Sequence, residues 1–242
     1  DVFSFIQKIE GIDFPRALEK LADRAGIVLE KRALDPNLGK KKILYELNHL
    51  TSEFYHYLLT KHAVGKVGLE YLKGKRGLTD RTIKDFMLGY APQEWDLLYK
   101  FLTKKKYKPE DILSSGLVIA RSGGDYVDRF RGRIVFTFTG LDGKIVGFTG
   151  RTIFDENPKY MNTPETLVFH KGSTVYALDK AKMSMKKEGA VFVEGNMDVI
   201  SAHQHGLKNV VAVSGTSLTT DQLKLISRYT NDLTFCFDSD IF

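Results

Sequence analysis

The chain has 242 residues, of which 43% are hydrophobic and 27% are charged, so it is long enough for one large globular domain or two small ones. No apolar run reaches the roughly 20 residues of a membrane-spanning helix, and the first residues lack the basic start and apolar centre of a signal peptide. The single cysteine, Cys236, excludes an internal disulfide and a cysteine-based zinc site in this chain, which favours a reducing cytoplasm.

The net charge of +6 is unevenly distributed. Residues 121–187 hold 12 Lys and Arg against 7 Asp and Glu, whereas residues 188–242 hold 3 against 7. A basic block followed by an acidic block indicates a polyanionic partner beside a cation site. Two ordinary solvated surfaces would give the same counts, so charge alone leaves both interpretations open.

The first 39 residues are expected to form a helix and a polar linker. Asp13 is a suitable N-cap for a helix that Gly26 ends, and residues 30–41 are polar with a proline and a glycine. The chain starts without methionine inside an amphipathic segment and stops just after a strand. We therefore expect it to be a fragment of a longer protein.

Two helical patterns follow. Apolar residues recur at helical spacing over 41–62. Residues 69–92 predict a helix, a turn and a second helix, with Thr79 as N-cap and Gly89 as C-terminal stop.

Residues 126–151 alternate in polarity and are rich in β-branched and aromatic residues, which predicts antiparallel strands joined by a hairpin at Asp142-Gly143. Arg129, Arg131 and Arg133 occupy alternate positions and are expected on one face.

From residue 189 the pattern changes to strand, helix, strand, helix, strand, which predicts a parallel α/β unit. The last strand includes residues 233–237, and Cys236 is expected to be a small buried core residue in it. The predicted fold class is thus an α+β region of helices and antiparallel sheet, followed by an α/β Rossmann-like parallel sheet.

Carboxylates follow two of these strands. Glu194 comes directly after the first, Asp238 and Asp240 end the third, and Asp198 lies one turn into the intervening helix. Ligands bind at the carboxyl ends of parallel strands, and clustered carboxylates need a cation such as Mg²⁺ or Mn²⁺. Gly195 is expected to let the chain turn away from Glu194. A polar strand end is the alternative for Asp238 and Asp240 taken alone.

The segments "VFVEGNMDVISAHQHG", "AVSGTSLTTDQLKLI" and "CFDSD" resemble the TOPRIM domain, a metal-binding α/β module of primases, topoisomerases and some nucleases. Upstream, "DRFRGRIVFTF", "GKIVGFTGR", "NPKYMNTPET" and "FHKGSTVYALDKAK" resemble, in order, the RNA-polymerase catalytic core of bacterial replicative primases. The resemblance covers nearly the whole chain. It implies an exit from a zinc-binding module over 1–39, a basic subdomain over 40–188 and a partial TOPRIM domain over 189–242.

The resemblance implies synthesis of an RNA primer from ribonucleoside triphosphates on a single-stranded DNA template. It assigns Mg²⁺ or Mn²⁺ to Glu194, Asp238 and Asp240, with Asp198 as a ligand or a neighbouring partner. Zinc would bind only in an N-terminal module outside this chain, and a replicative helicase would bind a C-terminal domain outside it. The nucleotide and template contacts that it implies are Arg76, Arg151, Lys159, Tyr160, Asn162, Lys171, Arg129 and Arg131, with Arg133 as a further template candidate.

Two other functions remain open: a TOPRIM topoisomerase or nuclease, and a module that only binds single-stranded nucleic acid. His203 and His205 are expected on a helix surface without a metal, while Tyr90 and Trp95 are expected to pack in the core or a loop.

Overall fold

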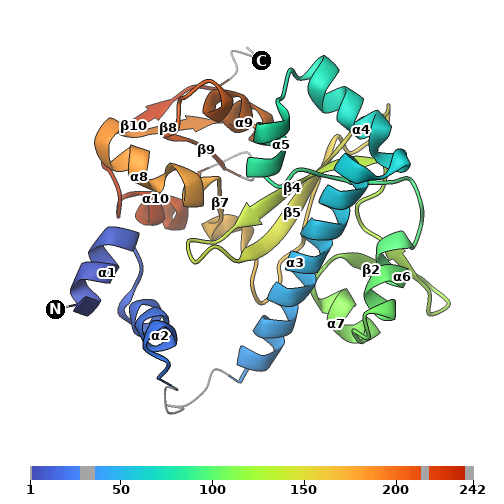
Figure 1. The fold of residues 1–242 in the computed structure, drawn as a ribbon, viewed down its shortest axis with the longest axis horizontal. Helices are drawn as coiled ribbons and strands as arrows, with labels where there is room; N and C mark the ends of the chain where they lie inside the picture. Colours follow the sequence, from blue (N-terminus) through green and yellow to red (C-terminus); the bar gives the residue numbers. More distant parts are fainter. Residues whose placement is uncertain (1, 28–35, 214–217, 238–242) are drawn as a thin grey trace.

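The computed structural model describes residues 2–27, 36–213 and 218–237, which form two four-stranded sheets with covering helices and one two-stranded sheet (Figure 1). The first four-stranded sheet is antiparallel and the second is mostly parallel, which confirms the predicted fold class. No helix within these residues is long and apolar enough to cross a lipid bilayer.

Two helices, α1 (Val2–Glu10) and α2 (Phe14–Ala25), open the described chain. Asp13 caps α2 as predicted, accepting a hydrogen bond from a backbone N–H of the first turn at 3.2 Å, and Gly26 ends the helix in the left-handed conformation. The ammonium group of Lys186 ties α1 to the second half of the chain by donating to two of its carbonyl oxygens, at 3.0 and 3.2 Å. Most of the predicted linker, residues 28–35, lies outside the described residues.

A long helix, α3 (Leu38–Lys61), lies across the first sheet (Figure 1). Its residues Leu47 and Leu58 belong to the same core cluster as Val135 and Phe148 of the sheet. The remaining elements of this region are short: η1 (Ala63–Gly65), α4 (Lys66–Glu70), the π-helical turn η2 (Tyr71–Lys75), α5 (Asp80–Asp85), β1 (Gly89–Ala91), α6 (Leu97–Lys104), α7 (Pro109–Ser114), β2 (Val118–Ala120), β3 (Tyr126–Asp128), β4 (Arg133–Thr139), β5 (Ile145–Thr152), β6 (Tyr160–Asn162) and η3 (Lys171–Ser173).

The predicted helix, turn and helix over 69–92 is confirmed except at its end. Thr79 caps α5 by accepting a hydrogen bond from the Thr82 N–H at 3.1 Å. The prediction that Gly89 stops the helix was wrong, because α5 ends at Asp85 and Gly89 lies in β1. A Cβ on Gly89 would lie 2.6 Å from the Cβ of Tyr55, so glycine allows β1 to approach α3 closely.

The hairpin of β4 and β5 forms as predicted, with Gly143 in its turn at a φ of 80°. The single-face row of Arg129, Arg131 and Arg133 does not form. Strand β3 ends at Asp128 and β4 begins at Arg133, so residues 129–132 form a connection that includes Gly132 at a φ of 63°. The period-two rule applies only within a continuous strand.

The second sheet has the strand order β10, β8, β9, β7. Strand β8 runs parallel to β9 and β10, as predicted, and β7 is antiparallel to β9. Strand β7 and helix α8 join this sheet although they precede residue 189. The elements are β7 (Val175–Tyr176), α8 (Leu178–Glu188), β8 (Ala190–Val193), α9 (Asn196–Gln204), β9 (Val210–Val213), α10 (Thr220–Ile226) and β10 (Leu233–Phe235).

Helices cover both faces of the second sheet. Val211 of β9 clusters with buried residues of α8 and α10, whereas its neighbour Val210 clusters with Ile200 of α9. The α9 cluster also contains Ile134 and Phe136 of β4, so one apolar core joins the two sheets. Because this core is shared, the first sheet and the end of β8 are held in a defined relative position.

The prediction of a buried last strand was wrong. Strand β10 has three residues and pairs with β8 at the edge of the sheet. Phe235 is 50% exposed, and Cys236 is exposed as well. An apolar run predicts a strand, but it does not reveal whether strands pair with it on one side or on both. Among the described residues, β10 pairs only with β8.

A buried carboxyl group, Asp128, gives the fold a pH-dependent contribution. Its two oxygens accept hydrogen bonds from the N–H groups of Leu98 at 2.7 Å and Tyr99 at 3.0 Å, at the start of α6. Burial raises the pKa of Asp128 from 3.8 to about 6, against the opposing effect of these two N–H groups.

The folded protein holds the proton of the Asp128 carboxyl group more tightly than the unfolded chain does. We therefore expect protonated Asp128 to stabilise the fold at about pH 4, and this stabilisation to be lost as the pH rises through about 6. Relative to Asp128→Asn, the free energy of unfolding of the wild type should fall by up to about 3 kcal/mol between about pH 4 and pH 7. Urea unfolding of both proteins at the two pH values measures this. A pH-independent difference between them would contradict it.

Candidate active site

Glu194 follows the carboxyl end of β8 and precedes α9, at the sheet edge where the sequence predicts a cation site. Glu194 and Asp198 are both exposed. An oxygen of Asp198 accepts a hydrogen bond from the Gly195 N–H at 3.1 Å, which stabilises the first turn of α9. Gly195 has a φ of −114°, open to any residue, but a Cβ there would lie 2.7 Å from this oxygen. Gly195 therefore makes room for Asp198, and the predicted conformational need for glycine was wrong.

Four side chains of the first region form what we call the arginine–tyrosine cluster: Tyr71, Arg76, Arg151 and Tyr160. Arg76 Nε donates to the Tyr71 hydroxyl at 2.8 Å, and Arg151 Nη1 donates to the Tyr160 hydroxyl at 3.1 Å. The Arg151 guanidinium lies 5.9 Å from the ring centroid of Tyr71 and 5.4 Å from that of Tyr160. Phenol groups thus orient both cations, and neither forms an ion pair with a carboxylate in the described part of the chain. Their charge is suited to an anionic ligand.

Asp198, in the acidic segment of residues 194–198, affects the cluster electrostatically. Burial raises the pKa of the Tyr160 phenol; Arg151 and Arg76 lower it, and the Asp198 carboxylate raises it. Asp198 is 38 residues beyond Tyr160 in the sequence and lies in α9, a helix that packs on the second sheet. The charges of Arg76, Arg151 and Asp198 thus all act on the Tyr160 phenol.

The other predicted nucleotide contacts differ in their surroundings. Lys159 is exposed and directly precedes Tyr160 of the cluster. Asn162 accepts a hydrogen bond from the Thr149 hydroxyl, so its amide helps to hold β6 to β5. Lys171 is exposed at the start of η3, and its backbone N–H donates to Glu165 at 2.9 Å.

The three predicted template arginines have separate roles. Arg129 is partly buried and donates to the Gly116 carbonyl oxygen at 2.6 Å. Arg131 donates to the Asp128 carbonyl oxygen and stacks on Trp95, 4.6 Å from the ring centroid. Arg133 is only 4% exposed, so the expectation that it contacts the template was wrong.

Arg133 instead supports the loop that carries Lys159. It donates to the carbonyl oxygens of Gly150 at 3.2 Å, Lys159 at 3.3 Å and Pro158 at 2.9 Å. We expect Arg133→Met to lower the free energy of unfolding by about 3 kcal/mol, because three carbonyl groups lose a charged donor. Urea unfolding measures the loss, with Arg81→Met on the exposed side of α5 as control. Equal stability of the two variants would contradict this role for Arg133.

Trp95 lies in a loop, which is one of the two predicted alternatives, and not in the core. It is 54% exposed, and the guanidinium groups of Arg121 and Arg131 lie 4.4 and 4.6 Å from its ring centroid. No sequence signal indicated this contact, because the immediate neighbours of Trp95 are the acidic residues Glu94 and Asp96, whereas both arginines come from elsewhere in the chain. Tyr90 is buried, as predicted.

His203, in α9, and His205, which directly follows that helix, differ in burial. His205 is exposed, as predicted, but His203 is buried and its Nε2 lies 2.9 Å from the Val210 carbonyl oxygen. Burial lowers the pKa of His203, which favours the neutral ring.

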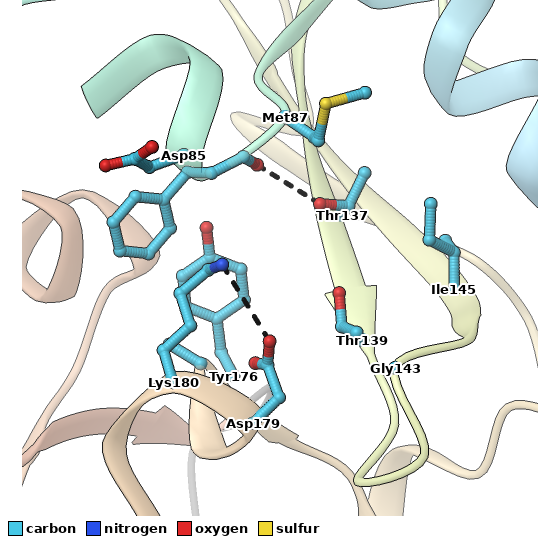
Figure 2. A pocket seen from close by; sticks show the side chains of 11 residues that line it. Asp85, Met87, Thr137, Thr139, Gly143, Ile145, Tyr176, Asp179 and Lys180 are labelled. Carbon is cyan, nitrogen blue, oxygen red and sulfur yellow. Dashed lines mark hydrogen bonds and ion pairs between the residues drawn. The ribbon is translucent and has the colours of Figure 1, made fainter. Parts of the chain in front are cut away.

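A cavity of about 140 Å³ lies between the β4–β5 hairpin and the start of α8 (Figure 2). Tyr176, Asp179 and Lys180 lie on one side of it, with Thr137 and Thr139 on the other. The cavity has no residue in common with the arginine–tyrosine cluster or the acidic segment. We assign it to the junction between the two sheets.

No group of three His, Cys, Asp or Glu side chains that could hold a metal occurs among residues 2–27, 36–213 and 218–237. Two of the predicted ligands, Asp238 and Asp240, lie outside these residues. Glu194 and Asp198 supply carboxylate oxygens, a donor type that fits Mg²⁺ or Mn²⁺ and disfavours softer metals.

Comparison with known proteins identifies the family. Residues 54–182 match the family described as "DNA primase catalytic core, N-terminal domain", and residues 191–241 match "Toprim-like". The DNA primase of Deinococcus radiodurans is 43% identical over 245 residues, which cover 99% of this chain and 41% of that protein. The chain thus spans about two fifths of the length of this curated relative.

Solved structures agree with the sequence relatives. The RNA polymerase domain of the Mycobacterium tuberculosis primase DnaG superposes with a TM-score of 0.77 at 32% identity, covering 84% of this chain and 68% of that one. A DnaG primase catalytic domain bound to single-stranded DNA gives a TM-score of 0.75 at 35% identity, covering 84% and 66%. The first family match covers more than half of the chain, and these relatives share its fold. The chain therefore belongs to the DNA primase family and carries part of its catalytic core.

Proposed function

We propose that this chain contributes the nucleotidyl-transfer site of an enzyme that makes RNA primers from ribonucleoside triphosphates on a single-stranded DNA template. The observation that carries the proposal is that α9, which begins just after the exposed Glu194, is hydrogen-bonded through Gln204 to the turn that follows Arg76 of the arginine–tyrosine cluster. Nucleotidyl transfer needs carboxylates for divalent ions and cations for a triphosphate in the same place.

Glu194, Asp238 and Asp240 are the proposed metal ligands and catalytic carboxylates, with Asp198 beside them. Strand β10 runs parallel to β8 with Phe235 level with Phe192, which supports a common edge for the residues that follow both strands. Bound Mg²⁺ or Mn²⁺ would favour ionisation of the attacking 3′-hydroxyl and offset charge on the leaving pyrophosphate. The protein's own part is to hold the carboxylates on two adjacent strands.

Arg76, Arg151 and Lys159 are the proposed triphosphate contacts. The two guanidinium groups are already oriented by Tyr71 and Tyr160, so little side-chain freedom is lost on binding phosphate. Tyr160, Asn162 and Lys171 are proposed at the margin of the nucleotide.

The template is proposed to cross the surface formed by Trp95, Arg121 and Arg131, with Arg129 behind it. An exposed aromatic ring close to two cations suits stacked bases and a phosphate backbone, without reading sequence. A related catalytic domain has been solved with single-stranded DNA, which supports this assignment.

The wider setting follows from the bacterial primase relatives. We propose that the protein works in the bacterial cytoplasm at replication forks, and that a replicative helicase binds it outside this chain. Zinc is proposed only for a module that precedes this chain.

Incorporation of labelled ribonucleotides by the full-length protein tests the proposal. We expect short RNA products that require a single-stranded DNA template and Mg²⁺. DNA relaxation or cleavage without incorporation would instead support a topoisomerase or nuclease, and template binding without any reaction would support a binding module.

A further inference from the structure

We propose that Gln204 is a positioning residue that fixes Arg76 relative to the acidic edge of the second sheet. The inference rests on the proposed function, because it concerns how the two halves of that site are held together. Gln204 is the last residue of α9, the helix that begins two residues after Glu194.

The Gln204 amide bonds two main-chain groups of the turn that follows Arg76. Its Nε2 donates to the Gly77 carbonyl oxygen at 3.0 Å, and its Oε1 accepts from the Thr79 N–H at 2.9 Å. Both polar atoms of the amide are used, the nitrogen as a donor and the oxygen as an acceptor. Two such bonds restrict the rotation of the turn as well as its distance from α9.

The turn is anchored on both sides, so its position is transmitted to Arg76. Gly77, at a φ of 66°, directly follows Arg76, and the Leu78 N–H donates to the Leu72 carbonyl oxygen at 2.9 Å. Thr79 then caps α5. A shift of this turn against α9 would therefore move the Arg76 guanidinium relative to the carboxylates at the other end of α9.

Apolar contacts alone would hold the turn of residues 77–79 against α9 in a less defined orientation. Leu72, Leu78 and Ile83 share a core cluster with Met197 and Ile200 of α9. Apolar burial is non-directional and tolerates small rotations, whereas the Gln204 bonds do not. Helix α9 has nine residues and is about 13 Å long, so it connects Gln204 rigidly with the Glu194 end. A displacement of about 1 Å at a reacting centre can cost roughly a hundredfold in rate.

Gln204→Met in the full-length protein tests the inference, because methionine keeps the length of the side chain and removes both hydrogen bonds. We expect kcat/KM for ribonucleotides to fall roughly tenfold, with unchanged affinity for the DNA template. Ser201→Ala, at an exposed position of the same helix, is the matched control and should retain wild-type activity. Wild-type kcat/KM in Gln204→Met would overturn the inference.

A double-mutant cycle with Arg76→Ala separates positioning from general stability. If Gln204 acts through Arg76, Gln204→Met should cost less than about twofold in the residual activity of Arg76→Ala, while the two shifts in thermal midpoint add. A full tenfold loss in that background would show that Gln204 acts elsewhere. If Arg76→Ala itself keeps full activity, the proposed role of Arg76 fails, and the inference fails with it. Loss in Arg76→Ala but not in Gln204→Met overturns the inference alone.

Discussion

Glu194→Gln in the full-length protein is expected to reduce primer synthesis by roughly a thousandfold or more, because the amide keeps the shape of the side chain and removes a negative charge that the proposed divalent ion needs. Glu194 is exposed at the end of β8, so the substitution should leave the free energy of unfolding within about 0.5 kcal/mol of wild type. Incorporation of labelled ribonucleotides on a single-stranded template measures the activity, and urea unfolding measures the stability.

The matched control for this substitution is Glu188→Gln. Glu188 is an exposed glutamate that ends α8, just before the opposite end of β8. We expect this variant to retain wild-type activity. Comparable loss in both variants, or full activity in Glu194→Gln, would show that the carboxyl end of β8 is not the reacting edge.

Arg151→Ala is expected to lower kcat/KM for ribonucleoside triphosphates by roughly a hundredfold, because it removes the proposed phosphate contact, a guanidinium that Tyr160 already orients. Arg151→Lys should recover only part of the loss, since an ammonium keeps the charge but lacks the planar two-pronged donor. Steady-state kinetics with varied nucleotide concentration measures both.

Arg24→Ala, on the exposed surface of α2, is the control for loss of a single positive charge. It should leave the kinetic constants unchanged. Full recovery in Arg151→Lys would mean that charge alone matters at this position, and an unaffected Arg151→Ala would remove the cluster from the proposed site.

The sequence predicted the order and type of most elements because their signals are local. Asp13 and Thr79 cap helices as expected, and the Asp142-Gly143 turn joins β4 and β5. Each of these predictions depends on a few neighbouring residues, whose preferences the rest of the fold does not override.

Predictions that needed a neighbour from elsewhere in the chain fared worse. Alternation placed Arg133 on one face with Arg129 and Arg131, yet its guanidinium is buried against carbonyl groups of Gly150 and Pro158. Cys236 was expected in the core, but β10 lies at the sheet edge. His203 was expected at the surface, but the shared core covers it. Burial depends on what packs against a segment, which periodicity does not contain.

The candidate site was predictable in its parts and not in its arrangement. Arg76, Arg151 and Tyr160 were named from motifs, but Tyr71, which accepts the hydrogen bond from Arg76 and lies near Arg151, was not singled out. The Gln204 bridge joins positions more than a hundred residues apart, so no local pattern could predict it. Asp238 and Asp240 remain predictions.

Iron-mediated cleavage of the full-length protein tests most directly whether the acidic edge and the arginine–tyrosine cluster surround one metal site. With added hydrogen peroxide as oxidant and ascorbate to recycle the iron, Fe²⁺ placed in a Mg²⁺ site produces hydroxyl radicals that cut nearby backbone, so cleavage maps the neighbours of the ion. We predict cuts close to residues 194–198 and 238–240, with weaker cuts near residues 76 and 151–160, all suppressed by excess Mg²⁺ and absent in Glu194→Gln. Cleavage confined to one of these segments, or unaffected by Mg²⁺ and by Glu194→Gln, would contradict a shared site.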